Sequence, residues 1–186
     1  LLSEGCRLDG FICPGHVSTV LGEQGFAFLP REYGLPAAIA GFEVLDILVA
    51  IDYLVDAALG HRPVELFNEY RRWVRPEGNR RALAVLEETF APCEAPWRGL
   101  GTIPASGLAL RPEYARFDAN AAFPAPPLPP PRRRACRCGD VLRGAIHPPE
   151  CTLFGRGCDP QHPVGPCMVS GEGACAAYYR YGDGEE

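Results

Sequence analysis

The sequence predicts a parallel-sheet α/β domain followed by a small cysteine-rich domain. Short apolar runs alternate with amphipathic stretches over residues 1–118, as expected when strands and helices alternate in a mostly parallel sheet. Six of the nine cysteines lie after residue 135. That last segment has too few apolar side chains to form a core without a covalent or metal staple. We therefore expect an α/β domain at 1–118, a Pro-rich linker at 119–135 and a cysteine module at 136–186.

The strands are predicted from short apolar runs that end at turn residues. The best helix begins at Val44, because apolar residues recur there at a spacing of three to four and Gly60 suits its stop. In parallel sheets, functional side chains gather in the loops after the strands. Here those loops are the PGH segment at 14–16 and the GFE segment at 41–43. The predicted strands are 8–13, 35–40, 64–74 and 97–104, and the predicted helices are 44–59 and 78–90.

Single residues near these loops have competing interpretations. His16 is equally compatible with a functional loop and with a bond to a neighbouring carbonyl. Glu43 and Asp46 are interpreted as acids at a helix start. The RPEGN segment at 75–79 is interpreted as a turn into a helix. Cys13 and Cys93 are expected to be buried small hydrophobes.

Composition excludes several classes of protein. The net charge of −5 gives no general attraction to nucleic acid or anionic lipid. No apolar run reaches the roughly 18–20 residues that span a bilayer. All 18 basic residues are Arg, which excludes Schiff-base and P-loop lysine chemistry. The first four residues, LLSE, resemble neither an initiator nor an export signal, so we expect a cytoplasmic protein that is a piece of a longer one.

The cysteine module has the spacing C-x-C-x12-C-x6-C-x8-C-x7-C. A zinc site usually takes two short knuckles, and only one C-x-C is present. A disulfide set would need an oxidising compartment. A 4Fe–4S cluster takes four thiolates at scattered positions, which favours an iron–sulfur domain and leaves two cysteines as a redox pair. His147 and His162 could bind a metal but are not needed. Arginines near the cysteines in sequence could raise the reduction potential of such a cluster. They are Arg132, Arg133, Arg134, Arg137, Arg143 and Arg156. For Arg132, Arg133 and Arg134, we favour the simpler interpretation that they form the solvated end of the linker.

Several motifs stand out along nearly the whole chain apart from the Pro-rich linker. They are PGHVS at 14–18, GFE at 41–43 with LDIL at 45–48, VRPEGN at 74–79, RPEY at 111–114, CRCGDVLRG at 136–144, PECTLFG at 149–155, PVGPCMVS at 163–170 and EGAC at 172–175. In this order, the motifs resemble the HypD family of nickel–iron hydrogenase maturation factors.

The resemblance implies a function and a set of site residues. The family has two α/β domains plus a cluster domain, and it assembles an Fe(CN)2CO centre with a HypC-type chaperone and HypE/HypF-type cyanide donors. For this chain, the resemblance therefore implies an accessory protein in redox chemistry and assembly. The alternative is a zinc-stapled interaction module without redox activity, and a third reading is a disulfide-stapled exported domain. The implied 4Fe–4S ligands are Cys136, Cys151, Cys158 and Cys175, and the implied redox dithiol is Cys138 with Cys167.

The sequence also departs from the family pattern. The C-G-x-H and G-P-G-C-P-x-C motifs that hold the iron in that family do not occur here, and Cys6, Cys13 and Cys93 fit neither. We therefore expect a gene fragment that resembles the second α/β domain plus the cluster domain. Such a fragment is not expected to assemble the iron site by itself.

Overall fold

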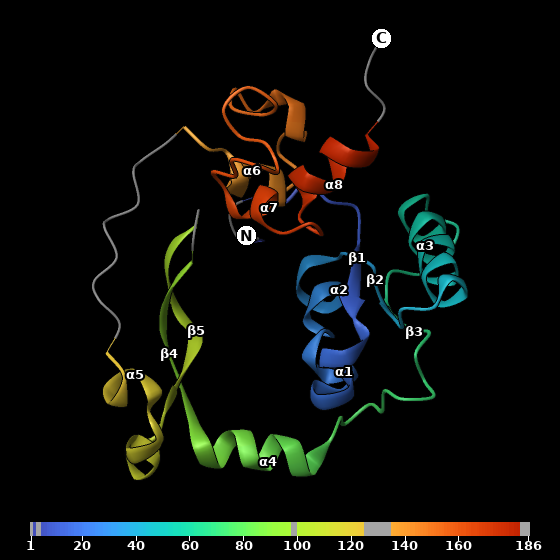
Figure 1. Ribbon diagram of the computed structural model, residues 1–186. Helices are drawn as coiled ribbons and strands as arrows, with labels where there is room; N and C mark the ends of the chain where they lie inside the picture. The colour runs from blue at the N-terminus through green and yellow to red at the C-terminus, as the bar shows by residue number, and fades with distance from the viewer. Residues whose placement is uncertain (1, 3–4, 98–99, 125–134, 183–186) are drawn as a thin grey trace. The chain divides into compact units, whose positions relative to one another are not determined.

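A computed structural model describes residues 2, 5–97, 100–124 and 135–182 of the 186-residue chain. The chain forms two compact units, drawn in Figure 1. The sheet unit is Leu8–Thr89, and the C-terminal unit is Leu1–Arg7 together with Phe90–Glu186. This division falls before the domain bound at residue 118 that the sequence predicts. Because contacts do not test independent folding, the predicted domain bounds stay a prediction.

The sheet unit contains three parallel strands in the order β1-β2-β3. They are β1 (Phe11–Pro14), β2 (Ala37–Ala40) and β3 (Leu66–Asn68). Every residue of β2 is buried, as expected for the central strand of a sheet that is covered on both faces. The α/β class with a parallel sheet is therefore confirmed.

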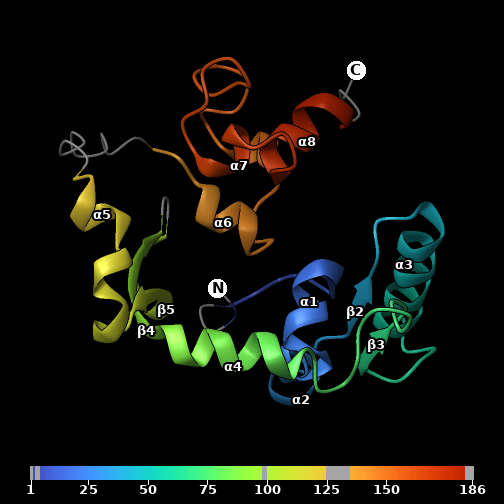
Figure 2. The same ribbon diagram turned by 60° about the horizontal axis from the view of Figure 1, so that its bottom comes forward.

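Helices cover this small sheet from both sides. Figures 1 and 2 agree that α3 lies on one side of the sheet and that α1 and α2 lie on the other. Alanines of β2 pack against Ala50, Tyr53 and Ala57 of α3, and the Tyr53 ring stacks on Phe67 with centroids 4.8 Å apart. The helices are α1 (Gly15–Leu21), η2 (Glu23–Gly25), α2 (Phe28–Tyr33), α3 (Val44–Ala58) and α4 (Arg80–Thr89).

Two of these helices match the sequence prediction closely. Helix α3 begins at Val44 and ends at Ala58, where Gly60 adopts a positive φ of 76° that favours glycine. Helix α4 begins two residues later than predicted and ends one residue earlier. The predicted loop at Pro14-Gly15-His16 is wrong, because Pro14 closes β1 and α1 begins directly at Gly15. Gly15 is needed there, since a Cβ atom would collide with the Ala40 carbonyl.

The prediction of a fourth parallel strand at 97–104 is also wrong. The structure has a separate antiparallel pair, β4 (Phe90–Trp97) and β5 (Gly101–Leu110). A ladder of this kind forms between segments that are neighbours in sequence, because two antiparallel strands need only a short turn between them. The pair belongs to the C-terminal unit.

The C-terminal unit is otherwise built from short helices and loops. Of the predicted linker, residues 119–122 form a helix, and residues 125–134, including Arg132, Arg133 and Arg134, lie outside the described part of the chain. No helix among the described residues has the length and apolar character to cross a bilayer. The short helices are η3 (Pro112–Phe117), α5 (Ala119–Ala122), α6 (Cys138–Leu142), η4 (Pro148–Glu150), α7 (Pro166–Val169) and α8 (Ala174–Tyr181).

Candidate functional site

The six cysteines of the module come from helix ends and from the loops between them. Cys138 opens α6, Cys167 lies in α7 and Cys175 lies in the first turn of α8. Cys136, Cys151 and Cys158 lie outside these helices. Five of the six are buried and Cys136 is partly buried, and all nine cysteines of the chain are free thiols. No disulfide bond joins any of these nine cysteines, all of which lie in the described part of the chain, so the structure does not support a disulfide-stapled domain.

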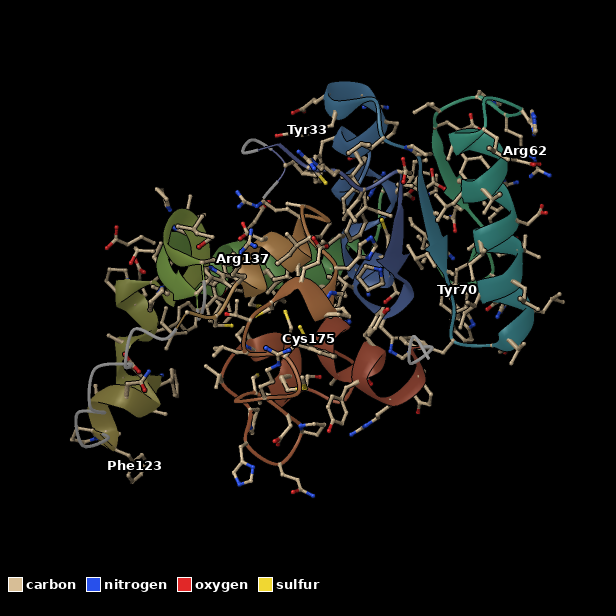
Figure 3. The ribbon with its side chains drawn as sticks, turned by 90° about the horizontal axis from the view of Figure 1, so that it is seen from above. Tyr33, Arg62, Tyr70, Phe123, Arg137 and Cys175 are labelled. Atoms are coloured by element: carbon tan, nitrogen blue, oxygen red, sulfur yellow. The ribbon has the colours of Figure 1, made fainter. Side chains whose placement is uncertain are left out.

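Most of these thiols lie in one packed cluster. Cys138, Cys158, Cys167 and Cys175 form its buried centre with Met168, and Cys136 packs against them. Figure 3 shows sulfur atoms gathered beside Cys175. Met168, only 2% exposed, fills space in this cluster. The core of this small module thus consists largely of sulfur atoms, which packing alone does not require.

Cys151 is buried but lies outside that packed cluster. It is still close enough to act on the others electrostatically. Burial raises the pKa of the Cys175 thiol to about 11, with further contributions from Cys138, Cys151 and Cys158. Burial likewise raises the pKa of Cys136, and Cys138, Cys151 and Cys158 add to that effect. All six sulfurs therefore lie close enough together to take part in one electrostatic environment, which raises the pKa values of Cys136, Cys167 and Cys175.

Backbone groups also approach these sulfurs. The Val164 N–H donates to Cys158 Sγ at 3.3 Å, and the Cys138 N–H donates to the Cys136 sulfur, which lowers that pKa in opposition to burial. A Cβ atom at Gly165 would collide with Cys136 Sγ. Because Gly165 has an ordinary φ of −98°, this close approach to sulfur accounts for a glycine there.

Cys138 and Cys167 are hydrogen-bonded to each other. Burial raises the pKa of the Cys167 thiol, and a hydrogen bond to the Cys138 sulfur raises it further. These are the two residues that the resemblance implies as a redox dithiol. The structure thus brings together two cysteines that lie 29 positions apart in the sequence.

The histidines and two of the arginines of the module have partners other than the thiols. His162 is 80% exposed and faces Asp159, and the His147 backbone N–H bonds Glu150. Arg137 and Arg143 both pair with Asp140 and lower the pKa of that carboxyl. Over residues 2, 5–97, 100–124 and 135–182, no three His, Cys, Asp or Glu side chains are arranged as they would be around a single metal ion.

Of the three cysteines outside the module, Cys13 is the clearest. It is 3% exposed on β1, and burial raises its pKa to about 12, so it behaves as a buried small hydrophobe, as predicted. Cys93 on β4 and Cys6 are only partly buried. The prediction of full burial for Cys93 is therefore wrong, because its partner on the neighbouring strand is Gly107, which has no side chain to cover it.

A second group of polar side chains lies at the carboxyl edge of the sheet. The His16 ring packs on Phe42 with centroids 4.7 Å apart. Asp46, whose side chain is 5% exposed, accepts two hydrogen bonds from Arg72, at 3.0 and 2.5 Å. Glu43 is 77% exposed and lies 3.4 Å from the same guanidinium. Asp46 is thus more than a helix-start acid, because it is the buried partner of the partly exposed Arg72 in an ion pair.

Sequence reasoning missed Arg72 and Tyr70 at this edge. Arg72 lies over the Tyr70 ring at 4.6 Å from its centroid, and Tyr70 presses on Gly41, where a Cβ atom would meet Asp46 and Tyr70. No local pattern reveals this pairing, because Arg72 is 26 residues from Asp46. The RPEGN segment after them forms a turn into α4, as predicted.

Comparison with known proteins shows which family the chain is similar to. The family model described as "HypD: Hydrogenase formation hypA family" matches residues 1–182. The chain is 48% identical to the hydrogenase expression/formation protein HupD of Azotobacter chroococcum mcd 1, over 95% of this chain and 46% of that protein. It is 47% identical to the hydrogenase maturation factor HypD of Cupriavidus necator, over 94% of this chain and 46% of that protein.

A third relative extends the comparison. The hydrogenase maturation factor HypD of Escherichia coli K12 is 45% identical over 94% of this chain and 47% of its own length. The chain spans about half the length of the curated relatives it matches. With the family model covering residues 1–182, the chain belongs to the HypD family of hydrogenase formation proteins.

Proposed function

We propose that this chain serves hydrogenase maturation as a scaffold and a 4Fe–4S/thiol redox module for assembly of the Fe(CN)2CO centre. The observation that carries the proposal is the gathering of six free, largely buried thiols in one small module. Thiolates are the protein ligands that hold iron–sulfur clusters. The relatives are named as hydrogenase maturation factors, which supports the biological process.

The chemistry of the donors fits a cluster. Four of the six thiols, those of Cys138, Cys158, Cys167 and Cys175, pack together in one buried cluster. The Cys138 N–H donates to the Cys136 sulfur and lowers its pKa, and the Val164 N–H donates to Cys158 Sγ at 3.3 Å, which are the contacts that N–H donors make with the sulfurs of bound clusters. Each ligand of a 4Fe–4S cluster binds a different iron, so its thiolates stand farther apart than ligands of one ion. The proposal therefore does not require three side chains arranged around one metal ion.

The proposed ligands are Cys136, Cys151, Cys158 and Cys175, and the proposed redox dithiol is Cys138 with Cys167. The hydrogen bond between Cys138 and Cys167 supports this division, because a dithiol must bring its sulfurs together. Oxidation of that pair to a disulfide releases two electrons and two protons. A bound 4Fe–4S group would supply one-electron transfer at the same site.

The partners and compartment are proposed on the same basis. We expect a HypC-type chaperone and HypE/HypF-type cyanide donors as partners, in the cytoplasm. No interaction with nucleic acid is proposed, in keeping with the net charge of −5. The two motifs that hold the iron in the family do not occur within these 186 residues, so we propose no iron-holding role for them.

Metal analysis tests the cofactor directly. The full chain is purified without oxygen, and iron, acid-labile sulfide and zinc are measured together with the visible spectrum. We expect about four irons per chain and a broad band near ~400 nm that bleaches on reduction. Cys175→Ser, which removes a proposed ligand, should lower the iron content by about half or more. Cys93→Ser, which changes a thiol outside the module, is the matched control and should leave it unchanged.

The other results would decide against the proposal. A colourless protein with about one zinc per chain would establish the zinc-stapled alternative. Retention of full iron content by Cys175→Ser would remove that residue from the ligand set. For the dithiol, Cys138→Ser and Cys167→Ser should keep the iron but lose one thiol-to-disulfide couple in a redox titration.

A further inference from the structure

The sheet unit contains a polar cavity whose lining includes neither the cysteines of the module nor the polar residues around Asp46 and Arg72. It lies between α1 and the turn that leads into α4, with a volume of about 690 Å³. Its lining includes Trp73 and three arginines, and all of it comes from one unit. The side chains that matter here are Thr19, Trp73, Arg75, Glu77, Arg80 and Arg81.

The arginines of this cavity are available for a ligand. Within the described part of the chain, Arg75, Arg80 and Arg81 form no ion pair, whereas Arg62 and Arg72 each hold acidic partners. The chain as a whole has a net charge of −5, so these three arginines around one cavity form a positive region on an acidic protein. A local positive potential of this kind attracts an anionic ligand.

Backbone contacts give the cavity a fixed base. Gly22 and Gly78 have positive φ values of 74° and 67°, and a Cβ atom on either would collide with backbone of the other segment. The Asn79 N–H donates to the Val20 carbonyl at 3.0 Å, and the Asn79 side chain accepts from the Ala82 N–H at 3.1 Å. The arginines therefore project from a rigid turn and helix start, which lowers the entropy lost on binding.

Trp73 gives the cavity a character beyond charge. Its side chain is 65% exposed, while the next residue, Val74, is 2% exposed. An exposed Trp among arginines is typical of the residues that dominate protein–protein binding energy. Small-molecule sites, by contrast, are lined mainly by apolar side chains. Glu77 would repel a compact phosphate group but can accept hydrogen bonds from the N–H groups of a peptide.

We propose that this cavity binds an acidic, carboxylate-rich polypeptide segment of a partner protein. Arginine forks bind carboxylates through paired hydrogen bonds, and the Trp73 ring packs on the peptide between its acidic side chains. The interaction depends on residues of the sheet unit alone. It therefore holds whether or not the thiols bind iron.

A labelled hexaglutamate peptide with blocked termini tests this proposal on the full chain. Fluorescence anisotropy should show saturable binding with a Kd of roughly 100 µM or lower at ~0.15 M salt. The triple variant Arg75→Gln/Arg80→Gln/Arg81→Gln should bind about tenfold or more weakly. Trp73→Ala should weaken binding by about tenfold, and this loss should persist at ~0.3 M salt, where long-range attraction is screened.

Matched controls separate this site from general charge. Arg156→Gln removes one exposed arginine of the C-terminal unit and should leave the Kd unchanged. All substituted residues are exposed, so circular dichroism should confirm that the variants fold. Absence of saturable binding would overturn the proposal, and so would equal binding by the triple variant. Tripolyphosphate that binds more tightly than the peptide and displaces it would assign the cavity to phosphate ligands instead.

Discussion

Loss of the Arg72 guanidinium is the most informative perturbation of the sheet unit. Arg72→Ala leaves the Asp46 carboxylate without the two hydrogen bonds that it now accepts. That carboxylate is 5% exposed, and Gly41 and Tyr70 close around it. Water cannot easily replace the lost donors, so the variant keeps a buried charge that is nearly unpaired.

The expected cost follows from the burial of the two partners. Removal of one partner from a fully buried ion pair costs roughly 3–5 kcal/mol. Because the Arg72 side chain is 42% exposed, solvent already screens part of the interaction. We therefore expect Arg72→Ala to lower the free energy of unfolding by about 2–3 kcal/mol. In urea this corresponds to a midpoint shift of about 1 M with an unchanged slope.

Urea unfolding followed by far-ultraviolet circular dichroism measures this change. Arg62→Ala is the matched control, because Arg62 pairs with Asp52 and Asp56 on the exposed side of α3. Such a surface pair contributes about 1 kcal/mol or less. Arg72→Ala combined with Asp46→Asn should cost less than the sum of the single changes. Equal midpoint shifts for Arg72→Ala and Arg62→Ala, or strict additivity of the double variant, would refute the role of Arg72.

Two further outcomes are expected. Tyr53→Phe keeps the ring that packs on the sheet but removes the hydroxyl that bonds the Glu65 N–H and carbonyl at 3.1 and 2.9 Å, so it should cost about 1–3 kcal/mol in the same urea experiment. Gly165→Ala should lower bound iron about twofold or more, because its Cβ atom would collide with Cys136 Sγ. Gly157→Ala is the control for the latter, since a Cβ atom there meets only Leu153 at 3.8 Å, and equal iron in both variants would contradict the prediction.

Local patterns account for the parts of the fold that sequence reasoning found. The helix from Val44 to Ala58 is visible because its apolar residues recur with the period of a helix. The strands at 11–14 and 37–40 are visible because short apolar runs end in glycine or proline. The antiparallel pair at 90–110 was missed, because Pro92, Pro96 and Pro104 lie inside its strands, and proline within a run argues against a paired strand. Its register joins Phe90 to Leu110, and no periodicity in either strand specifies that partner.

The candidate sites divide in the same way. The sequence alone identified the six cysteines, their module and the family motifs, because the supply of thiols and the scarcity of apolar side chains are properties of composition. Only the tertiary structure placed Cys138 beside Cys167, Gly165 against Cys136, and Arg72 on Asp46. These contacts join residues separated by 26 or more positions, and a pairing at that range is decided by how the whole chain packs. Which side chains meet is thus a result of folding, whereas which side chains are available is already written in the sequence.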